Sequence, residues 1–237
     1  MKAVILAGGE GTRLRPLTSN TPKPMLPMAN RPMMEHIVRL LARHGFDEII
    51  VTVAFLANQI RNHFGDGSEF GVSMRYATED TPLGTAGSVR NAADELDEPF
   101  LVISGDVLTD IDLSAFVAAH REAGALASIA LKQVENPLEF GIVITEEDGS
   151  IERFLEKPTW GQVFSDTINT GIYVLDPRVF SYIPPDAVVD FSGDVFPAAL
   201  ADGERLLGHI VEGYWEDVGT LESYLSSHQD MLDGRVD

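Results

Sequence analysis

Three glycines near the N-terminus are followed closely by three cations. Gly8, Gly9 and Gly11 come after the apolar run 3–6, which predicts a buried first strand. Glycines allow a tight turn whose N–H groups can approach an anion without a Cβ in between. The cations that follow are Arg13, Arg15 and Lys23. Freed amides beside positive side chains indicate a phosphate site; the structural alternative is a glycine-rich surface turn with solvated arginines.

The loop does not match two common kinds of nucleotide-binding loop. No Gly-Lys-Ser/Thr follows it, so it is not a Walker A loop. A dinucleotide-binding fingerprint would need a glycine where Leu14 stands, and an acidic residue after the second strand to hold a ribose. The apolar run 49–54 ends without a carboxylate. Hydride transfer with a nicotinamide cofactor is therefore disfavoured.

Composition and charge exclude several classes of protein. The chain has 237 residues and no cysteine, which excludes a cysteine nucleophile and a thiolate metal site. Its 17 Lys and Arg against 37 Asp and Glu give a net charge of −20, which disfavours a nucleic-acid partner. No apolar run has the length of a membrane span, and the N-terminus lacks a signal pattern. We therefore expect a cytoplasmic protein without a membrane partner.

Hydrophobic periodicity predicts an α/β fold. The first half alternates expected strands and helices, and this alternation favours a parallel sheet with right-handed crossovers. Its strands are expected at 3–6, 47–53, 72–76, 100–103 and 125–131, and its helices at 32–44 behind an Asn30 cap, 56–64, 85–96 and 113–120.

The second half has a different pattern. Strands at 141–145, 151–156 and 167–175 are joined by loops and predict an antiparallel excursion, with a hairpin turn at Asp148-Gly149. A helix at 194–201, a strand at 206–211 and a last helix capped by Thr220 complete the prediction. The expected fold is a Rossmann-like mixed, mostly parallel central sheet flanked by helices, with a smaller antiparallel part in the C-terminal half.

Several later motifs place polar groups at the ends of these elements. Asp106 follows the apolar strand 100–103, where a carboxylate could hold Mg²⁺ against phosphates or cap the next turn. The turn 83–87 opens a helix and could offer backbone groups to a base or phosphate, or serve as an N-cap at Thr85. Pro158 restricts Lys157 to an extended conformation, which aims its ammonium. Glu216 and Asp217 precede a glycine turn.

These motifs together resemble the signature of the sugar-1-phosphate nucleotidylyltransferases. The loop matches Gly-Gly-x-Gly-Thr-Arg-Leu-x-Pro-Leu-Thr followed by Pro-Lys-Pro, and the resemblance covers essentially the whole chain. The other matching segments follow in the family's order: Leu83-Gly84-Thr85-Ala86, Gly105-Asp106, Glu156-Lys157-Pro158, Asn169-Thr170-Gly171 and Trp215-Glu216-Asp217-Val218-Gly219. It implies a single catalytic domain, 1–237, with a nucleotide-binding half, 1–131, and a sugar-phosphate-binding half with the C-terminal helix, 132–237.

The resemblance also implies roles for individual residues. Arg13 and Lys23 would be catalytic, and Asp106 and Asp217 would hold Mg²⁺, with Glu216 the competitor of Asp217. The nucleotide would contact Leu6, Ala7, Gly8, Gly9, Gly11, Thr12, Glu79, Gly84 and Thr85. The sugar phosphate would contact Gly141, Glu156, Lys157, Asn169 and Thr170.

The implied reaction transfers a nucleotidyl group from a nucleoside triphosphate to a sugar 1-phosphate, in nucleotide-sugar biosynthesis. The motifs look most like those of mannose-1-phosphate guanylyltransferases, so GTP and mannose 1-phosphate are the expected substrates. Glucose-1-phosphate uridylyl- or thymidylyltransferase is the alternative within the family. A non-catalytic regulatory subunit is the alternative of another class, but it would be expected to lack some of Arg13, Lys23, Asp106 and Asp217. The family is commonly oligomeric, which allows for a homo-oligomer.

Overall fold

The computed structural model describes residues 1–134, 136–156 and 165–236. Internal contacts divide the chain into two compact units. Unit 1 comprises Met1–Pro82, Ile103–Asp112 and Gly213–Asp237, and unit 2 comprises Leu83–Val102 and Leu113–Glu212. The last helix, within Gly213–Asp237, thus belongs to the same unit as the N-terminal strands.

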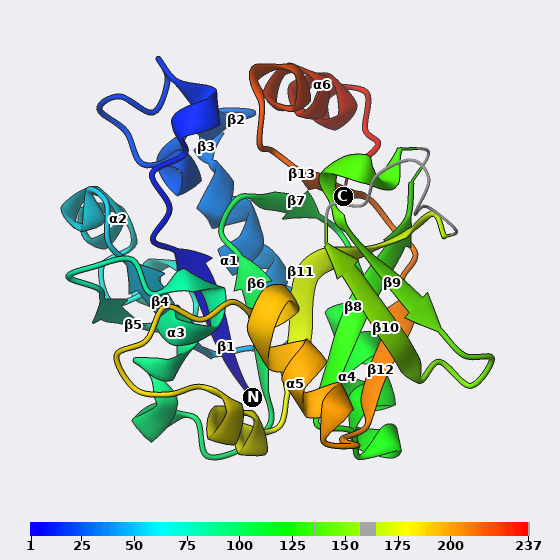
Figure 1. Cartoon of the computed structure of the whole chain (residues 1–237). Helices are drawn as coiled ribbons and strands as arrows, with labels where there is room; N and C mark the ends of the chain where they lie inside the picture. Colours follow the sequence, from blue (N-terminus) through cyan, green and yellow to red (C-terminus); the bar gives the residue numbers. More distant parts are fainter. Residues whose placement is uncertain (135, 157–164, 237) are drawn as a thin grey trace. The chain divides into compact units, whose positions relative to one another are not determined.

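Unit 1 contains a parallel sheet. Its strands lie in the order β1 (Lys2–Ala7), β4 (Glu48–Val53) and β5 (Ser73–Thr78), with Lys2 paired to Glu48 and Glu48 to Ser73 (Figure 1). Helices α1 (Met33–Arg43) and α2 (Ala57–Phe64) connect the strands. The βαβαβ pattern predicted for this region is confirmed.

Shorter elements complete unit 1. They are η1 (Thr12–Leu14), η2 (Lys23–Met25), β2 (Pro27–Met28), β3 (Arg31–Pro32), η3 (Ser68–Phe70), β7 (Val107–Thr109), β13 (Trp215–Asp217) and α6 (Leu221–Leu232). Strands β7 and β13 pair antiparallel. Thr220 caps α6 as predicted, in a capping box with Ser223. The Asn30 cap is wrong: Asn30 has φ 68° in the turn between β2 and β3, and Pro32 precedes α1.

Unit 2 contains a mixed sheet. Its strands lie in the order β10 (Ile151–Glu156), β9 (Gly141–Thr145), β11 (Thr167–Leu175), β8 (Ala127–Gln133) and β12 (Leu206–Ile210). All neighbours are antiparallel except β8 and β12, so the predicted antiparallel excursion is confirmed. Strand β6 (Phe100–Ser104) runs from unit 2 into unit 1.

Two of the helices expected in unit 2 are interrupted, whereas the third, α4 (Leu113–Ala123), extends beyond its expected end. The expected helix 85–96 divides into α3 (Gly84–Arg90) and the 3₁₀ turn η4 (Ala93–Glu95), and the expected helix 194–201 divides into the π-helical η8 (Phe191–Val195) and α5 (Phe196–Ala201). The other helical segments are η5 (Pro137–Glu139) and η7 (Pro177–Tyr182). Stacked rings of Phe154, Phe191 and Phe196 pack β10, η8 and α5 together.

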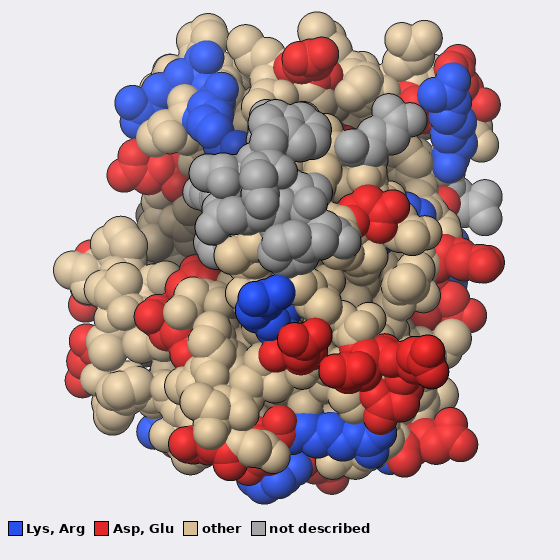
Figure 2. All heavy atoms as spheres, turned by 45° about the vertical axis from the view of Figure 1, so that its right-hand side comes forward, with Lys and Arg blue, Asp and Glu red and all other residues tan. Residues whose placement is uncertain are grey.

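One face of the molecule shows how its acidic side chains are distributed. On the face drawn in Figure 2, Asp and Glu lie at many separate places instead of in one patch. This distribution is what a solvated acidic surface would show. Among the described residues, no helix has the length and apolar character needed to cross a membrane.

A small core in unit 1 anchors the glycine loop. Leu14 is fully buried in a cluster whose other members are Leu26, Met28, Met33, Leu108 and Val218. Tyr224 and Met231 of α6 pack against the same cluster. The loop that carries Arg13 is therefore fixed by its neighbour Leu14, whereas Leu17 of the same loop is 40% exposed.

We expect Leu14→Ala to lower the free energy of unfolding by about 2–5 kcal/mol, the usual cost of a cavity left by a buried leucine. Leu17→Ala, the matched control, should change it by less than about 1 kcal/mol because most surface substitutions have small effects. Urea denaturation of both variants measures the difference. Equal losses would contradict the proposed anchoring of the loop.

Candidate active site

The glycine loop has a backbone that only glycine accommodates easily. Gly11 has φ 62°, and a Cβ there would lie 2.9 Å from the Cβ of Lys23 and 3.1 Å from the Cγ2 of Thr18. The hydroxyl of Thr18 donates a hydrogen bond of 2.8 Å to the Gly11 carbonyl. Gly11 therefore both turns the loop and lets the stem of Lys23 pass beside it.

The loop presents N–H groups and lies next to a buried carboxylate. Within the described residues, the amides of Gly8, Gly9 and Gly11 donate no hydrogen bond to the protein. Such amides form a concavity suited to an anion. A Cβ at Gly8 would lie 3.4 Å from the Oε1 atom of Glu79, which follows β5 and is buried. The sequence-predicted nucleotide residues of unit 1 are thus gathered around one turn.

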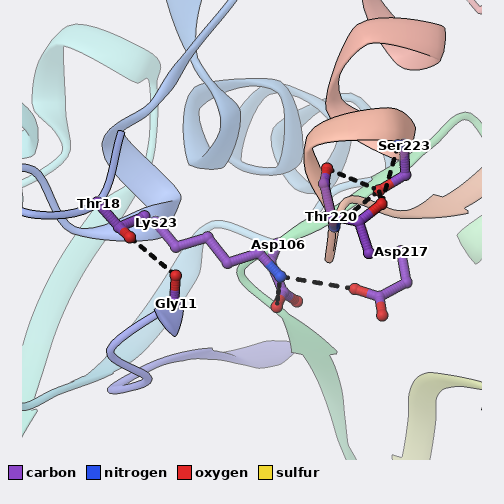
Figure 3. A network of polar contacts seen from close by, with 7 residues as sticks. All are labelled: Gly11, Thr18, Lys23, Asp106, Asp217, Thr220 and Ser223. Atoms are coloured by element: carbon purple, nitrogen blue, oxygen red, sulfur yellow. Dashed lines mark hydrogen bonds and ion pairs between the residues drawn. The ribbon is translucent and has the colours of Figure 1, made fainter. Parts of the chain in front are cut away.

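Lys23 lies between two carboxylates in the polar centre of unit 1 (Figure 3). Its ammonium is 2.5 Å from Oδ2 of Asp106 and 3.6 Å from Oδ1 of Asp217. The Lys23 side chain is only 8% exposed, and those of the two aspartates are 28% and 29% exposed. Three residues that the sequence resemblance implied as functional therefore form one cluster.

Backbone pairing fixes the two carboxylates. The amide of Gly105 donates to the Leu6 carbonyl at 2.8 Å, and a Cβ at Gly105 would lie 2.8 Å from that oxygen. Asp106, the next residue, therefore lies close to the C-terminal end of β1. Asp217 pairs with Val107 across β13 and β7, and the amide of Val218 donates to the Asp106 carbonyl at 3.2 Å. Asp217 lies in β13 and Asp106 in the turn directly before β7, whereas Lys23 comes from a separate 3₁₀ turn, η2.

The two aspartates have opposite pKa shifts. Burial favours the neutral acid at Asp106, but the Lys23 ammonium and hydrogen bonds from Lys23 and Ser104 hold its pKa below the ordinary value. Burial and the charge of Asp106 raise the pKa of Asp217, against the attraction of Lys23 and Arg13. One ammonium thus serves two carboxylates, and Asp217 is the less well compensated of the two.

Arg13 and Glu216 differ in their relation to this centre. The guanidinium of Arg13 lies over Gly219, where a Cβ would be 3.0 Å from Nη2, and it attracts the Asp217 carboxylate. Glu216 precedes Asp217 on β13, so it points to the opposite side of the strand. Burial and the charges of Asp217 and Asp230 raise the pKa of Glu216. Asp217, and not Glu216, therefore faces Lys23.

The donor set fits a hard divalent cation. Asp106 and Asp217 offer carboxylate oxygens, the ligands that Mg²⁺ prefers, and Mg²⁺ is usually held by one or two carboxylates plus phosphate oxygens. The shared ammonium leaves one negative charge in excess over the three side chains. Among the described residues there is no cluster of three or more His, Cys, Asp or Glu side chains arranged as a metal cage. Mg²⁺ held by two carboxylates usually keeps water or phosphate oxygens as its other ligands.

In unit 2, the turn that opens α3 uses many of its own polar groups. The amides of Ala86 and Gly87 donate to the Val189 carbonyl, and a Cβ at Gly84 would lie 2.5 Å from that oxygen. The Thr85 hydroxyl donates to Asp190 and accepts from the Phe191 amide, both at 3.0 Å. Thr85 is not the N-cap of α3, because Leu83 occupies that position. Glycine here serves close packing against 189–191.

The predicted sugar residues of unit 2 lie on its mixed sheet. Asn169 donates to Ser192 at 2.8 Å and to the Tyr173 hydroxyl at 3.0 Å. The Thr170 side chain is buried and donates to the Ala130 carbonyl at 2.7 Å, so its hydroxyl is used within the sheet. Gly141 is the first residue of β9 and Glu156 the last of β10, and the two pair. Lys157 lies outside the described residues.

Sequence reasoning missed two partners of these residues. Asp190 and Ser192 contact Thr85 and Asn169 through side-chain hydrogen bonds. Neither stands in a motif or a periodic pattern, so no signal in the single sequence could have identified them.

Comparison with known proteins gives a consistent family assignment. A family model described as nucleotidyl transferase matches residues 2–234. A UTP–glucose-1-phosphate uridylyltransferase from Synechocystis is 39% identical over 100% of this chain and 64% of its own length. A mannose-1-phosphate guanylyltransferase from Mycobacterium tuberculosis is also 39% identical, over 98% of this chain and 65% of its own length. The chain thus spans somewhat less than two thirds of the curated relatives it matches.

A solved structure supports the fold over nearly the whole chain. A Bacillus anthracis protein, provisionally described as a glucose-1-phosphate thymidylyltransferase, superposes with a TM-score of 0.88 at 30% identity. The match covers 97% of this chain and 94% of that one. The expected fold class, a mixed and mostly parallel sheet flanked by helices, is confirmed. With a loop of free amides, a lysine between two carboxylates and a family match over residues 2–234, this chain belongs to the nucleotidyl transferase family.

Proposed function

We propose that this chain transfers a nucleotidyl group from a nucleoside triphosphate to a sugar 1-phosphate. The observation that carries the proposal is the cluster of Lys23, Asp106 and Asp217 beside the glycine loop. A phosphate oxygen of the sugar 1-phosphate would attack the α-phosphorus, the bond between the α-phosphorus and the bridging oxygen would break, and pyrophosphate would leave. The products are a nucleoside diphosphate sugar and pyrophosphate.

The chemistry needs positioning and neutralisation more than proton transfer. A sugar 1-phosphate is already an anion near neutral pH, so its oxygen is a nucleophile without a general base. The obstacle is the repulsion between two polyanions that must meet in line. The loop amides would hold the triphosphate, Arg13 would neutralise the leaving phosphates, and Lys23 would bridge the α-phosphate and the sugar phosphate. In unit 2, Asn169 and Glu156 would contact the sugar, and Lys157 would contact its phosphate.

Asp106 and Asp217 would hold Mg²⁺ in the working enzyme. When bound, the cation would neutralise phosphate charge and polarise phosphoryl oxygens. The two carboxylates would orient it through strands β7 and β13, and Arg13 would limit the repulsion between Asp217 and the incoming phosphates.

GTP and mannose 1-phosphate are the substrates that we propose. Several relatives at 36–39% identity are named mannose-1-phosphate guanylyltransferases. The uridylyltransferase from Synechocystis, at 39% identity, supports UTP and glucose 1-phosphate as the second candidate. The side chain of Glu79 favours GTP over UTP. A carboxylate can accept two adjacent hydrogen bonds, and the N1–H and N2–H groups of guanine are two adjacent donors.

The function is tested by pyrophosphate release with Mg²⁺, crossing GTP, UTP, dTTP, ATP and CTP with mannose, glucose, galactose and N-acetylglucosamine 1-phosphates. We expect the highest kcat/KM for GTP with mannose 1-phosphate. The highest value for another pair would overturn the substrate assignment and keep the reaction. Nucleotide binding without release in any combination would contradict the proposed activity of this chain.

Lys23→Ala should lower kcat by at least about 10²-fold, the scale of losing one positioned charge. Lys132→Ala, which removes a lysine of unit 2 in β8, is the control and should keep nearly full turnover. Far-UV circular dichroism should show the same fold in both variants. A Lys23→Ala enzyme with near-normal kcat would refute the catalytic role.

Glu79→Gln should reduce the preference for GTP over UTP, measured as a ratio of kcat/KM values, by about 10-fold or more, because an amide cannot accept both hydrogen bonds of guanine. Glu10→Gln changes an exposed carboxylate of the same loop and should leave the ratio unchanged. If the two variants have the same ratio, Glu79 does not recognise the base.

A further inference from the structure

The ammonium of Lys23 occupies the position where a cation is needed most. Asp106 and Asp217 are held near each other by the pairing of β7 with β13 and by the hydrogen bond from Val218 to Asp106. Because the backbone fixes the two carboxylates near each other, they repel, and a cation is needed to offset this repulsion. In this structure that cation is Lys23, which contacts one carboxylate at 2.5 Å and the other at 3.6 Å (Figure 3).

Lys23 also reaches this centre from outside it. It lies between Pro22 and Pro24 at the start of the 3₁₀ turn η2, which shares no strand with either aspartate. Its stem runs past Gly11, and the Cβ and Cδ of Lys23 would lie 2.9 and 3.5 Å from a Cβ at Gly11. An ammonium on four flexible methylene groups can change its partner while the stem stays in place. If the ammonium leaves the carboxylates, it therefore remains beside the loop of free amides.

The proposed function gives the same groups two tasks that compete. Asp106 and Asp217 would hold Mg²⁺, and Lys23 would contact phosphate. Lys23 cannot give its ammonium fully to both aspartates and to phosphates. We propose that Lys23 is a stand-in cation: it neutralises Asp106 and Asp217 while no divalent cation is bound, competes with that cation, and is released toward the phosphates when the cation binds.

This competition would couple metal binding to phosphate binding. Without metal, the lysine neutralises charge on two partly buried carboxylates and is itself kept away from anions. With metal, the lysine gains freedom to contact phosphates beside the same loop. The inference rests on the proposed function for its second half only, because the competition itself concerns just three side chains and a metal ion.

The test is Mn²⁺ binding to the nucleotide-free chain, followed by electron paramagnetic resonance of free Mn²⁺. Lys23→Met removes the charge and keeps most of the side-chain volume. We expect its Kd for Mn²⁺ to be lower than that of the unchanged chain by about 10-fold or more, the range of typical coupling between sites. An equal or higher Kd in Lys23→Met, or no binding to it at about 10 mM Mn²⁺, would overturn the competition.

Matched variants separate charge from packing. Lys23→Arg keeps a positive charge and should not bind Mn²⁺ more tightly than the unchanged chain. Lys132→Met removes a lysine elsewhere and should leave the Kd unchanged. Asp106→Asn in the Lys23→Met background should weaken binding again. Tight binding by Lys23→Arg would mean that loss of packing, and not loss of charge, opens the site, and would overturn the inference.

A second measurement uses the unchanged chain and covers the case in which Lys23→Met does not fold. The chain has four lysines, at 2, 23, 132 and 157, which amine acetylation and mass spectrometry can follow separately. We expect Mg²⁺ to increase acetylation of Lys23 and to leave that of Lys2 and Lys132 unchanged. Unchanged labelling of Lys23 would overturn the release. Neither readout involves turnover, so an inactive chain would refute the proposed function and not the competition.

Discussion

The polar centre of unit 1 depends on one constraint: two carboxylates are fixed by backbone pairing, and one ammonium lies between them. Strand pairing brings Asp106 and Asp217 together at the cost of their mutual repulsion. Burial increases that cost because it weakens solvation of the charged forms, and the raised pKa of Asp217 reflects this. The excess negative charge of the two carboxylates favours the binding of a cation, which would remove their repulsion.

The surrounding elements serve this arrangement. Gly11 leaves room for the stem of Lys23, and Gly105 lets the chain approach the end of β1 closely enough to place Asp106. Leu14 and Val218 bury their side chains in the same small core. This packing fixes the backbone at the neighbouring residues, Arg13 and Asp217. Apolar packing therefore helps to set the polar geometry, because Arg13 and Asp217 each directly precede a buried residue in the chain.

Most of the regular fold could be predicted from the sequence, since apolar periodicity is strong in its longer elements. The strands 141–145, 151–156 and 167–175 have the predicted bounds. Strands β7 and β13 escaped prediction because three residues cannot display an alternating pattern. These two strands nevertheless place the aspartates. The residue types of the site were thus readable from motifs, whereas the pairing that unites them depends on contacts far apart in the chain.

The same limit explains the wrong Asn30 cap and the reading of the α3 turn. Helix N-cap positions and left-handed turn positions favour some of the same residue types, and asparagine is common at both. The residue type alone therefore does not distinguish them. At α3, the motif Gly-Thr-Ala-Gly indicated groups available to a ligand, yet Val189, Asp190 and Phe191 engage several of them. A glycine motif therefore indicates that another group comes close to the backbone, but it does not identify whether that group is a ligand or another part of the chain. In unit 2 the neighbour that approaches is the chain's own backbone, so any contact of this turn with a nucleotide must rely on the groups that 189–191 leave available.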